Sequence, residues 1–286
     1  MNPRTSTMGV PSRVTAPEQV RGQFAAERGM MFVKRQIVGT RLGLLAKQVR
    51  NKSCLMSAKR QDVGTCANDQ IAEILVTRLC ERWFVDVGAH IGSVIAEVRA
   101  HRPAVKITAF EPMCEKAAHL RRKFKDVDVI ACALADTEGE RKFYICPCET
   151  GYSSLARSDK TTNMISVPVR RLDTLVDGAD TIKIDVEGAE LGVLQGAERL
   201  TSRPLFMFES GPQDVLGYTK RDLWAWFEAH NYSIFLPSRV AHDAPPMSLE
   251  VFVDSHHYPR RAGNYFAIAA EKIEIIRNKA RAILTS

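Results

Sequence analysis

Long apolar runs are missing from this chain of 286 residues, and none reaches the roughly eighteen residues of a membrane-spanning helix. No apolar segment of the secretory type opens the chain, and the seven cysteines follow no regular spacing. Reduced thiols in a cytoplasmic compartment are therefore expected. Cys146 and Cys148 form a C-x-C pair without the second pair that is typical of zinc sites, so no metal site is predicted there.

Acidic residues are scarce in the first part of the chain. Residues 1–60 contain 12 Lys and Arg against 2 acidic residues, whereas the remainder contains 28 against 31. The basic excess belongs to an N-terminal extension, residues 1–65, which is predicted to be partly disordered or helical. Within it, residues 29–52 have the pattern of a basic amphipathic helix, which we interpret as packing on the domain or a partner, or as a peripheral contact with the inner face of a membrane. No aromatic residues are interleaved with the basic ones, so no nucleic-acid partner is expected.

A strand, a glycine turn and a helix follow one another in residues 83–93, which read W-F-V-D-V-G-A-H-I-G-S. The apolar residues around Asp86 predict a buried strand, and the apolar spacing after Gly92 predicts a helix. Such a unit places a nucleotide-like cofactor at the carboxyl end of the strand. Glycine lets the cofactor approach the backbone there, and the helix N-terminus supplies free N–H groups.

Strands and helices alternate through the remaining sequence, which predicts a doubly wound, seven-stranded and mostly parallel sheet closed by a late antiparallel strand. The strands are expected at 84–87, 105–110, 127–132, 181–185, 205–208, 232–236 and 264–270. Helices are expected at 68–80, 92–100, 114–124, 189–200, 220–230 and 271–283. Residues 141–146 and 164–169 predict an inserted hairpin around a polar loop at 150–162, which could cover a cofactor. Pro168 favours an edge strand there, and residues 238–261 are expected to be irregular. The chain is thus divided into the extension 1–65, a domain at 66–270 and a C-terminal helix at 271–286.

The glycine turn lacks the marks of two common nucleotide sites. Gly88 and Gly92 stand as G-x-x-x-G without the third glycine of the dinucleotide fingerprint, and no G-K-[ST] follows as in a P-loop. Asp86 would repel a pyrophosphate but would attract the sulfonium or the ammonium of S-adenosylmethionine. Glu111, at the end of the next strand, can accept hydrogen bonds from both ribose hydroxyls. These residues predict S-adenosylmethionine as the cofactor.

Longer motifs stand at six places along the chain. They are F-V-D-V-G-A-H-I-G at 84–92, F-E-P at 110–112, A-L-A-D-T-E-G at 133–139, G-Y-S-S-L at 151–155, R-L-D-T-L at 171–175 and I-K-I-D-V-E-G-A-E-L-G-V-L-Q-G-A at 182–197. Together they resemble the motifs of the FkbM family of S-adenosylmethionine-dependent methyltransferases. The resemblance leaves residues 1–65 out, and His90 stands where Asn is at least as usual in the family. It implies an α/β, Rossmann-like class I methyltransferase fold and O-methylation of a hydroxyl on a sugar, polyketide or similar small molecule.

Acidic residues at two neighbouring strand ends are the candidates for catalysis. Asp185 ends the fourth core strand and Glu209 the fifth. Their carboxylates would act as a general base on an acceptor hydroxyl, or would together hold a divalent cation, which is left open. Glu187, in the turn after Asp185, is the third candidate. The alternative for Asp185 is an internal ion pair with Lys183, which faces the same side of the strand.

The predicted cofactor-binding set combines the glycine turn with the next two strand ends. It consists of Asp86, Gly88, Ala89, His90, Gly92, Ser93, Glu111, Pro112, Ala133 and Asp136. Asp136 would accept a hydrogen bond from the adenine amino group or would merely cap a turn. The predicted function is O-methylation of a small molecule, sugar or glycan. The alternatives are an N-methyltransferase, which the absence of an Asn/Asp-Pro-Pro-aromatic motif disfavours, and a binding protein that retains only the fold.

Overall fold

The computed structural model describes residues 38, 40, 43, 45, 65–146, 150–157, 161, 163–211, 214, 217–257 and 263–285. The chain divides into two units, Met1–Gln36 and Ile37–Ser286, and all of the described residues belong to the second. Most of the predicted amphipathic segment 29–52 and of the extension 1–65 lies outside the described residues, so their roles stay predictions. Among the helices that the structure describes, none is long and apolar enough to cross a membrane.

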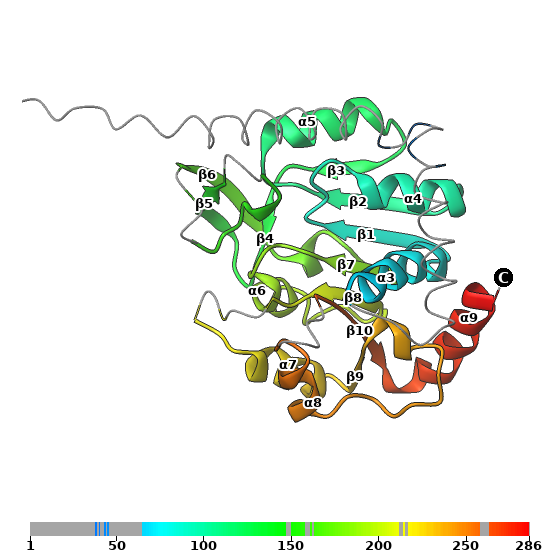
Figure 1. Cartoon of the computed structure of the whole chain (residues 1–286). Coiled ribbons are helices and arrows are strands. Elements are labelled where there is room, and N and C mark those ends of the chain that lie inside the picture. The colour runs from blue at the N-terminus through cyan, green and yellow to red at the C-terminus, as the bar shows by residue number, and fades with distance from the viewer. Residues whose placement is uncertain are drawn as a thin grey trace, which may run out of the picture. The chain divides into compact units, whose positions relative to one another are not determined.

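The central sheet has seven strands in the order β3-β2-β1-β7-β8-β10-β9 (Figure 1). They are β1 (Trp83–Val87), β2 (Lys106–Phe110), β3 (Asp128–Ile130), β7 (Thr181–Ile184), β8 (Leu205–Glu209), β9 (Tyr232–Phe235) and β10 (Asn264–Ala269). The sheet is parallel except for β10, which runs antiparallel to both β8 and β9. The predicted seven-stranded, doubly wound sheet with a late antiparallel strand is confirmed.

Helices cover both faces of this sheet, because alternate residues of each buried strand point to opposite sides. Phe84 packs in one core cluster with α3, α4, α5 and α9, whereas Val85 packs in a second cluster with α6, α7 and α8. The helices are α3 (Thr65–Leu79), α4 (Ser93–His101), α5 (Cys114–Lys123), α6 (Glu190–Gln195), α7 (Lys220–Ala229), α8 (Leu249–Asp254) and α9 (Ile273–Thr285). Short 3-10 turns lie at η1 (Thr150–Tyr152), η2 (Leu172–Thr174), η3 (Pro237–Arg239) and η4 (Ala270–Lys272).

The register between β1 and β7 is held at the start of both strands by Asp180. Its carboxylate accepts hydrogen bonds from the backbone N–H groups of Glu81, Arg82 and Trp83, at 2.8, 3.1 and 2.7 Å. In this register Asp86 lies beside Lys183. A single carboxylate before β7 thus helps to decide which side chains meet at the opposite end of the two strands.

The inserted segment forms a separate three-stranded sheet in the order β4-β6-β5. Its strands are β4 (Ala133–Leu134), β5 (Gly139–Ile145) and β6 (Asn163–Arg170). The hairpin was predicted, but the assignment of the Pro168 strand to an edge is wrong, because β6 is the middle strand. Since β4 pairs only with Val169 and Arg170, Pro168 lies just outside the part of β6 that has a strand on both sides. Its missing N–H is therefore tolerated.

Part of the segment predicted to be irregular, residues 238–261, is helical. α8 begins at Leu249, where the hydroxyl of the preceding Ser248 accepts the Val251 N–H at 3.3 Å. The ring of Phe252 is fully buried against Phe208 and Tyr265. A helix this short is stabilised by tertiary packing rather than by helix propensity, which is why the sequence pattern did not indicate it.

Candidate functional site

The turn after β1 has a left-handed backbone at three positions, with φ of 84° at Gly88, 49° at His90 and 77° at Gly92. The N–H groups of Gly88 and Ala89 both donate to the Phe110 carbonyl at 3.1 Å, which ties the turn to the end of β2. A Cβ on Gly88 would lie 1.9 Å from the carbonyl oxygen of Asp185. The structure therefore adds a packing reason for the first glycine to its conformational freedom.

Glu111 follows β2 directly and is 4% exposed. One of its carboxylate oxygens accepts the His90 N–H and the other accepts the Met113 N–H, both at 3.0 Å. Each oxygen retains a further lone pair for a ligand hydroxyl. Burial raises the pKa of Glu111, and the ammonium of Lys116 is the main influence that opposes the rise.

A cavity opens beside these groups, at the carboxyl ends of the central strands. It is lined by Val87, Gly88, His90, Phe110, Glu111, Pro112, Lys116, Cys132, Ala133, Leu134, Phe143, Gly151, Ser153, Leu155, Asp185, Val186 and Ala189. Of the predicted site residues, the lining includes Gly88, His90, Glu111, Pro112, Ala133 and Asp185. Those outside the lining are Asp86, Ala89, Gly92, Ser93, Asp136, Glu187 and Glu209. The loop after η1 contributes Ser153 and Leu155, so the inserted segment forms one wall.

Lys183 stands between the donor and acceptor halves of the predicted site. Its ammonium lies 3.2 Å from a carboxylate oxygen of Asp86 and 3.2 Å from one of Asp185. Burial alone would lower the pKa of Lys183, but Asp185 and Asp86 together raise it, so the side chain stays charged. The ion pair that was the alternative for Asp185 is present, and it extends to Asp86, which the sequence did not indicate.

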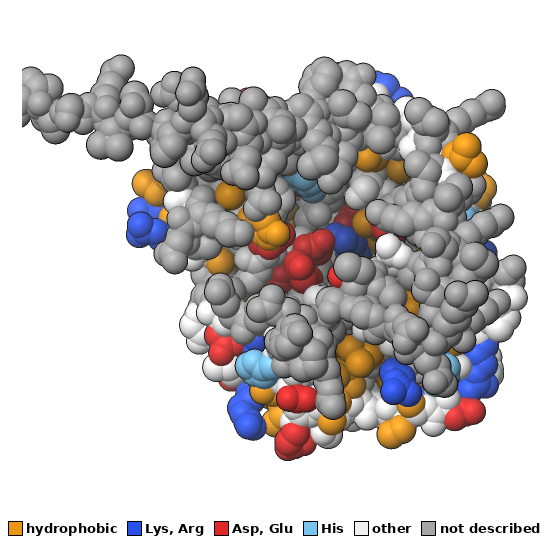
Figure 2. Space-filling view, viewed as in Figure 1, with side chains coloured by type: hydrophobic (Ala, Val, Ile, Leu, Met, Phe, Trp, Pro, Cys, Tyr) orange, Lys and Arg blue, Asp and Glu red, His pale blue; other side chains and the backbone are white. Residues whose placement is uncertain are grey.

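Three carboxylates gather next to this ion pair, on Asp185, Glu187 and Glu209. Within the described residues, they form a group whose oxygens lie within 4.8 Å of one another, close enough to hold a metal ion. Burial opposes the charge on Asp185, yet Lys183 and a hydrogen bond from Glu209 lower its pKa. Burial and the neighbouring Asp185 raise the pKa of Glu209, so the two carboxylates share one proton. Figure 2 shows acidic side chains in a hollow, with a basic side chain beside them.

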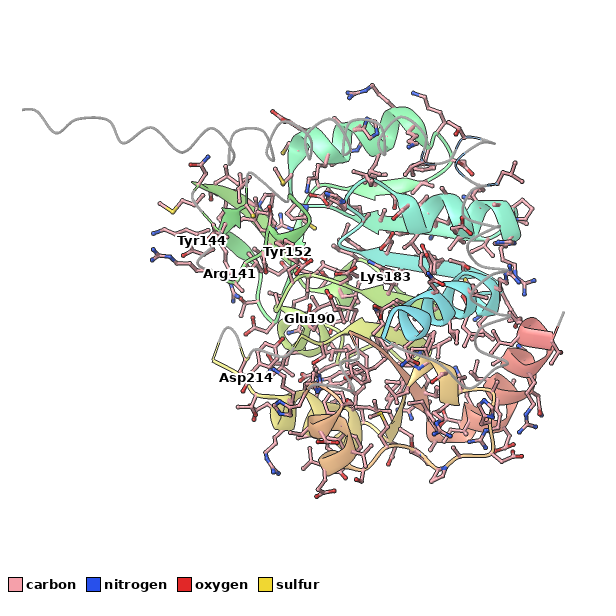
Figure 3. The ribbon with its side chains drawn as sticks, in the orientation of Figure 1. Arg141, Tyr144, Tyr152, Lys183, Glu190 and Asp214 are labelled. Atoms are coloured by element: carbon pink, nitrogen blue, oxygen red, sulfur yellow. The ribbon has the colours of Figure 1, made fainter. Side chains whose placement is uncertain are left out.

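The turn that carries Asp185 and Glu187 is held by a carboxylate from the start of α6. Glu190 is 2% exposed and accepts the N–H groups of Val186 and Gly188, at 3.2 and 3.1 Å. Its other oxygen accepts the Tyr218 hydroxyl at 2.9 Å. Figure 3 shows Glu190 at α6, next to the strand that bears Lys183. Glu187 itself has a φ of 56°, a conformation that costs a non-glycine residue about 1 kcal/mol and needs such support.

The inserted segment is tied to the same turn, because the Ser154 hydroxyl donates to the Val186 carbonyl at 2.7 Å. This serine also accepts the Ala156 N–H at 3.0 Å. The G-Y-S-S-L motif thus has one serine that connects the loop to the turn after β7 and one, Ser153, that lines the cavity.

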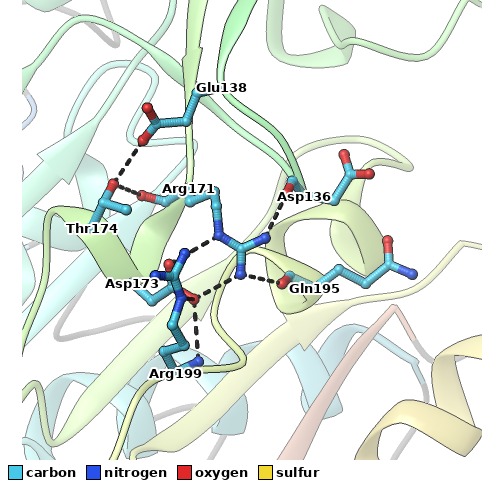
Figure 4. A network of polar contacts seen from close by, with 7 residues as sticks. All are labelled: Asp136, Glu138, Arg171, Asp173, Thr174, Gln195 and Arg199. Atoms are coloured by element: carbon cyan, nitrogen blue, oxygen red, sulfur yellow. Dashed lines mark hydrogen bonds and ion pairs between the residues drawn. The ribbon is translucent and has the colours of Figure 1, made fainter.

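Asp136 lies at the edge of this region, where its carboxylate pairs with Arg141 at 3.0 Å and is 43% exposed. Its backbone carbonyl accepts a hydrogen bond from Arg171, which also binds the Gln195 carbonyl and the buried Asp173 carboxylate (Figure 4). The R-L-D-T-L motif therefore holds the β4 region against the end of α6. The adenine contact of Asp136 stays a prediction.

Lys116 and Phe143 line the cavity, and neither was singled out from the sequence. The spacing of Lys116 to Ala117 and Leu120 on the buried face of α5 is a signal that could have indicated an inward-pointing lysine. No local pattern indicates Phe143, because a strand residue in an inserted sheet can face either side.

The strand order, the glycine turn and the cavity at the strand ends define a Rossmann-like methyltransferase fold. The family model described as the Methyltransferase FkbM domain matches residues 86–234, which is slightly more than half of the chain. The chain belongs to the FkbM methyltransferase family.

No curated protein matches the chain. Solved structures with a similar fold include a precorrin-6y C5,15-methyltransferase from Geobacter metallireducens, with 15% identity, 58% of this chain and 72% of that chain covered, and a TM-score of 0.37. A geranyl diphosphate methyltransferase in complex with SAM has 12% identity, coverage of 71% and 88%, and a TM-score of 0.39. The plantazolicin methyltransferase BpumL in complex with SAH has 10% identity, coverage of 87% and 100%, and a TM-score of 0.38. Similarities this distant carry no information on the substrate of this chain.

Proposed function

We propose that this protein transfers the methyl group of S-adenosylmethionine to a hydroxyl of a small molecule, sugar or glycan. The observation that carries the proposal is the cluster of carboxylates on Asp185, Glu187 and Glu209, because Asp185 also lines the cavity beside Glu111. The family membership supports the methyl-transfer chemistry.

In the donor half, each carboxylate oxygen of Glu111 has a lone pair that its backbone N–H partner does not use. These two lone pairs would accept hydrogen bonds from the ribose hydroxyls. The predicted role of Asp86 is electrostatic. It is 1% exposed and paired with Lys183, so its charge would act on the donor through the field of the pair rather than through direct contact. The donor is a sulfonium cation, which an excess of buried carboxylates over ammonium groups at the strand ends would stabilise.

In the acceptor half, the carboxylate pair would take the proton of the acceptor hydroxyl. Methyl transfer forms one C–O bond as the C–S bond breaks, and the positive charge of the sulfonium is lost. Lys183 and the protonated Glu209 keep Asp185 charged, so the Asp185 carboxylate would accept the proton of the hydroxyl as its oxygen attacks. Glu187 would place a third negative oxygen beside this pair.

A divalent cation held by Asp185, Glu187 and Glu209 is the alternative way to lower the pKa of the acceptor hydroxyl, and the spacing of their oxygens favours it. If methyl transfer survives treatment with EDTA, the metal-dependent mechanism is excluded and the carboxylate pair is the base.

Calorimetric titration with S-adenosylhomocysteine tests the proposal. We expect binding in the micromolar range, and no binding at high-micromolar concentration would leave a binding protein with a methyltransferase fold as the better interpretation. With donor binding established, release of S-adenosylhomocysteine is followed over a panel of sugar, polyol and amine acceptors. Asp185→Asn should lower this rate at least about a hundredfold while changing donor affinity little. Equal losses in both would assign Asp185 to donor binding, and transfer to amines alone would indicate an N-methyltransferase.

We further propose a cytoplasmic location and no nucleic-acid partner. The free thiols of Cys80, Cys114, Cys132 and Cys146 support a reducing compartment. A peripheral membrane contact through residues 29–52 remains part of the proposal, and flotation with anionic vesicles would test it.

A further inference from the structure

Lys116 occupies an unfavourable position for a cation. It lies in the first turn of α5, where the helix dipole repels positive charge, and it is only 7% exposed. The buried face of α5 consists of Lys116, Ala117 and Leu120, so the lysine is directed into the molecule rather than along the surface. Lys116 lines the cavity whose wall also contains Glu111.

Glu111 is the group in this cavity that gains from a nearby cation. Its two carboxylate oxygens are satisfied by one backbone N–H each, from His90 and Met113. A charged carboxylate keeps a lone pair on both oxygens for ligand hydroxyls, whereas a neutral carboxylic acid replaces one acceptor with an O–H donor. Burial favours the neutral form, and Lys116 is the main group that opposes this.

We propose that Lys116 is part of the donor site, where its ammonium keeps the buried Glu111 carboxylate charged and able to accept both ribose hydroxyls of S-adenosylmethionine. The inference rests on the proposed function and deepens it by assigning a positioning residue to donor recognition. Hydrogen bonds to a charged acceptor are about twice as strong as neutral ones, so the charge state of Glu111 bears directly on donor affinity.

Other titratable groups around Glu111 must be separated from this effect. The Asp86 carboxylate on β1 raises the pKa of Glu111. His90, Asp185 and the Cys132 thiol line the same cavity, and burial raises the pKa of the thiol to about 11, so it is neutral at physiological pH. Because wild type contains these same groups, a lysine variant is compared with wild type at each pH.

The experiment is calorimetric titration of the full chain with S-adenosylhomocysteine and with 5′-methylthioadenosine, which retains the ribose but lacks the amino-acid part. Lys116→Met should bind both ligands about tenfold more weakly than wild type at neutral pH, and the loss should diminish as the pH is raised and Glu111 ionises. Wild type should show no such recovery. Lys116→Arg, which retains the charge, should stay within about threefold of wild type. In a Glu111→Gln background, Lys116→Met should have no further effect.

Lys123→Met on the same helix is the matched control, since Lys123 is not part of the cavity wall, and it should leave both affinities unchanged. Thermal melts identify variants that fail to fold, in which case Lys116→Gln replaces the methionine variant. A loss with S-adenosylhomocysteine but not with methylthioadenosine would overturn the proposal, because Lys116 would then contact the amino-acid part. Wild-type affinity in Lys116→Met, or an equal loss in the Glu111→Gln background, would also overturn it. Failure of wild type to bind either ligand would instead reject the proposed function.

Discussion

At the residue scale, the site is built around an ammonium that serves two carboxylates. Asp86 and Asp185 belong to neighbouring strands and face the same side, and Lys183 lies 3.2 Å from each. The carboxylate before the glycine turn is therefore part of a buried charge balance as well as a candidate donor contact. A change at Asp86 should affect stability and donor binding together.

Asp86→Ala is expected to weaken S-adenosylhomocysteine binding at least about tenfold and to lower the free energy of unfolding by about 3 kcal/mol. The physical reason is that Lys183 loses one of two partners while it remains buried. Calorimetry and urea unfolding measure the two effects. Asp86→Asn, which retains the volume and the hydrogen-bonding capacity, should lose less stability but a similar share of affinity. Unchanged donor affinity in both variants would show that Asp86 serves the fold alone.

At the scale of elements, the turn between β7 and α6 is where three parts of the chain meet. β1 approaches it through Gly88, the inserted sheet binds it through Ser154, and the segment before α7 reaches it through Tyr218. The Glu190 carboxylate connects Tyr218 to the turn. The long family motif at 182–197 thus combines the carboxylates of Asp185 and Glu187 with the side chain that holds their turn.

Glu190→Ala should lower the free energy of unfolding by about 2–4 kcal/mol, because two buried N–H groups and a tyrosine hydroxyl lose their acceptor. Donor affinity should fall as well, since Val186 and Ala189 line the cavity. Glu190→Gln retains an acceptor oxygen for the N–H groups and should restore most of both quantities.

Tyr218→Phe should lower the free energy of unfolding by about 1 kcal/mol and should also weaken donor binding. Tyr265→Phe is the matched control, because it removes a buried hydroxyl that lies 2.7 Å from the Ser255 hydroxyl, away from the turn. If both tyrosine variants leave donor affinity at the wild-type value, Tyr218 does not position the turn.

At the scale of the whole molecule, the buried carboxylates at the strand ends set how stability depends on pH. Burial raises the pKa of Asp86, Glu111, Glu190 and Glu209. An acid whose pKa is raised by folding contributes stability that is fully present below its ordinary pKa of about 4 and is lost as pH rises through the folded value. The free energy of unfolding should therefore fall from mildly acidic to alkaline pH.

The expected slope attributable to Glu209 is about 1.4 kcal/mol per pH unit across neutrality, because the native pair holds one proton that the unfolded chain does not. Urea unfolding at about pH 5.5 and about pH 8.5 measures it, and Glu209→Gln should flatten the dependence by this amount. Glu228→Gln, on an exposed part of α7, should leave the slope unchanged. A wild-type stability that rises with pH over this range would contradict the shared proton.

Several features followed from local patterns alone. Spacing within short segments was enough to predict the strand, turn and helix at 83–93, the acid after β2 and the succession of seven strands along the chain. The structure confirms the fold. The helix α8 and the middle position of β6 did not follow, because contacts of Phe252 and of the two-residue strand β4 decide them. Local propensity is too weak in such short elements to compete with tertiary packing.

By itself, the sequence determined which residues could bind a donor and which carboxylates stand at strand ends, because strand periodicity and glycine turns are local properties. Only the tertiary structure decided that Lys183 pairs with Asp86 as well as with Asp185, that Glu209 lies beside Asp185, and that Lys116 lies in the wall with Glu111. These contacts join residues from different strands and helices. Their distances depend on strand register and helix packing, and burial then strengthens the electrostatic interaction at each contact.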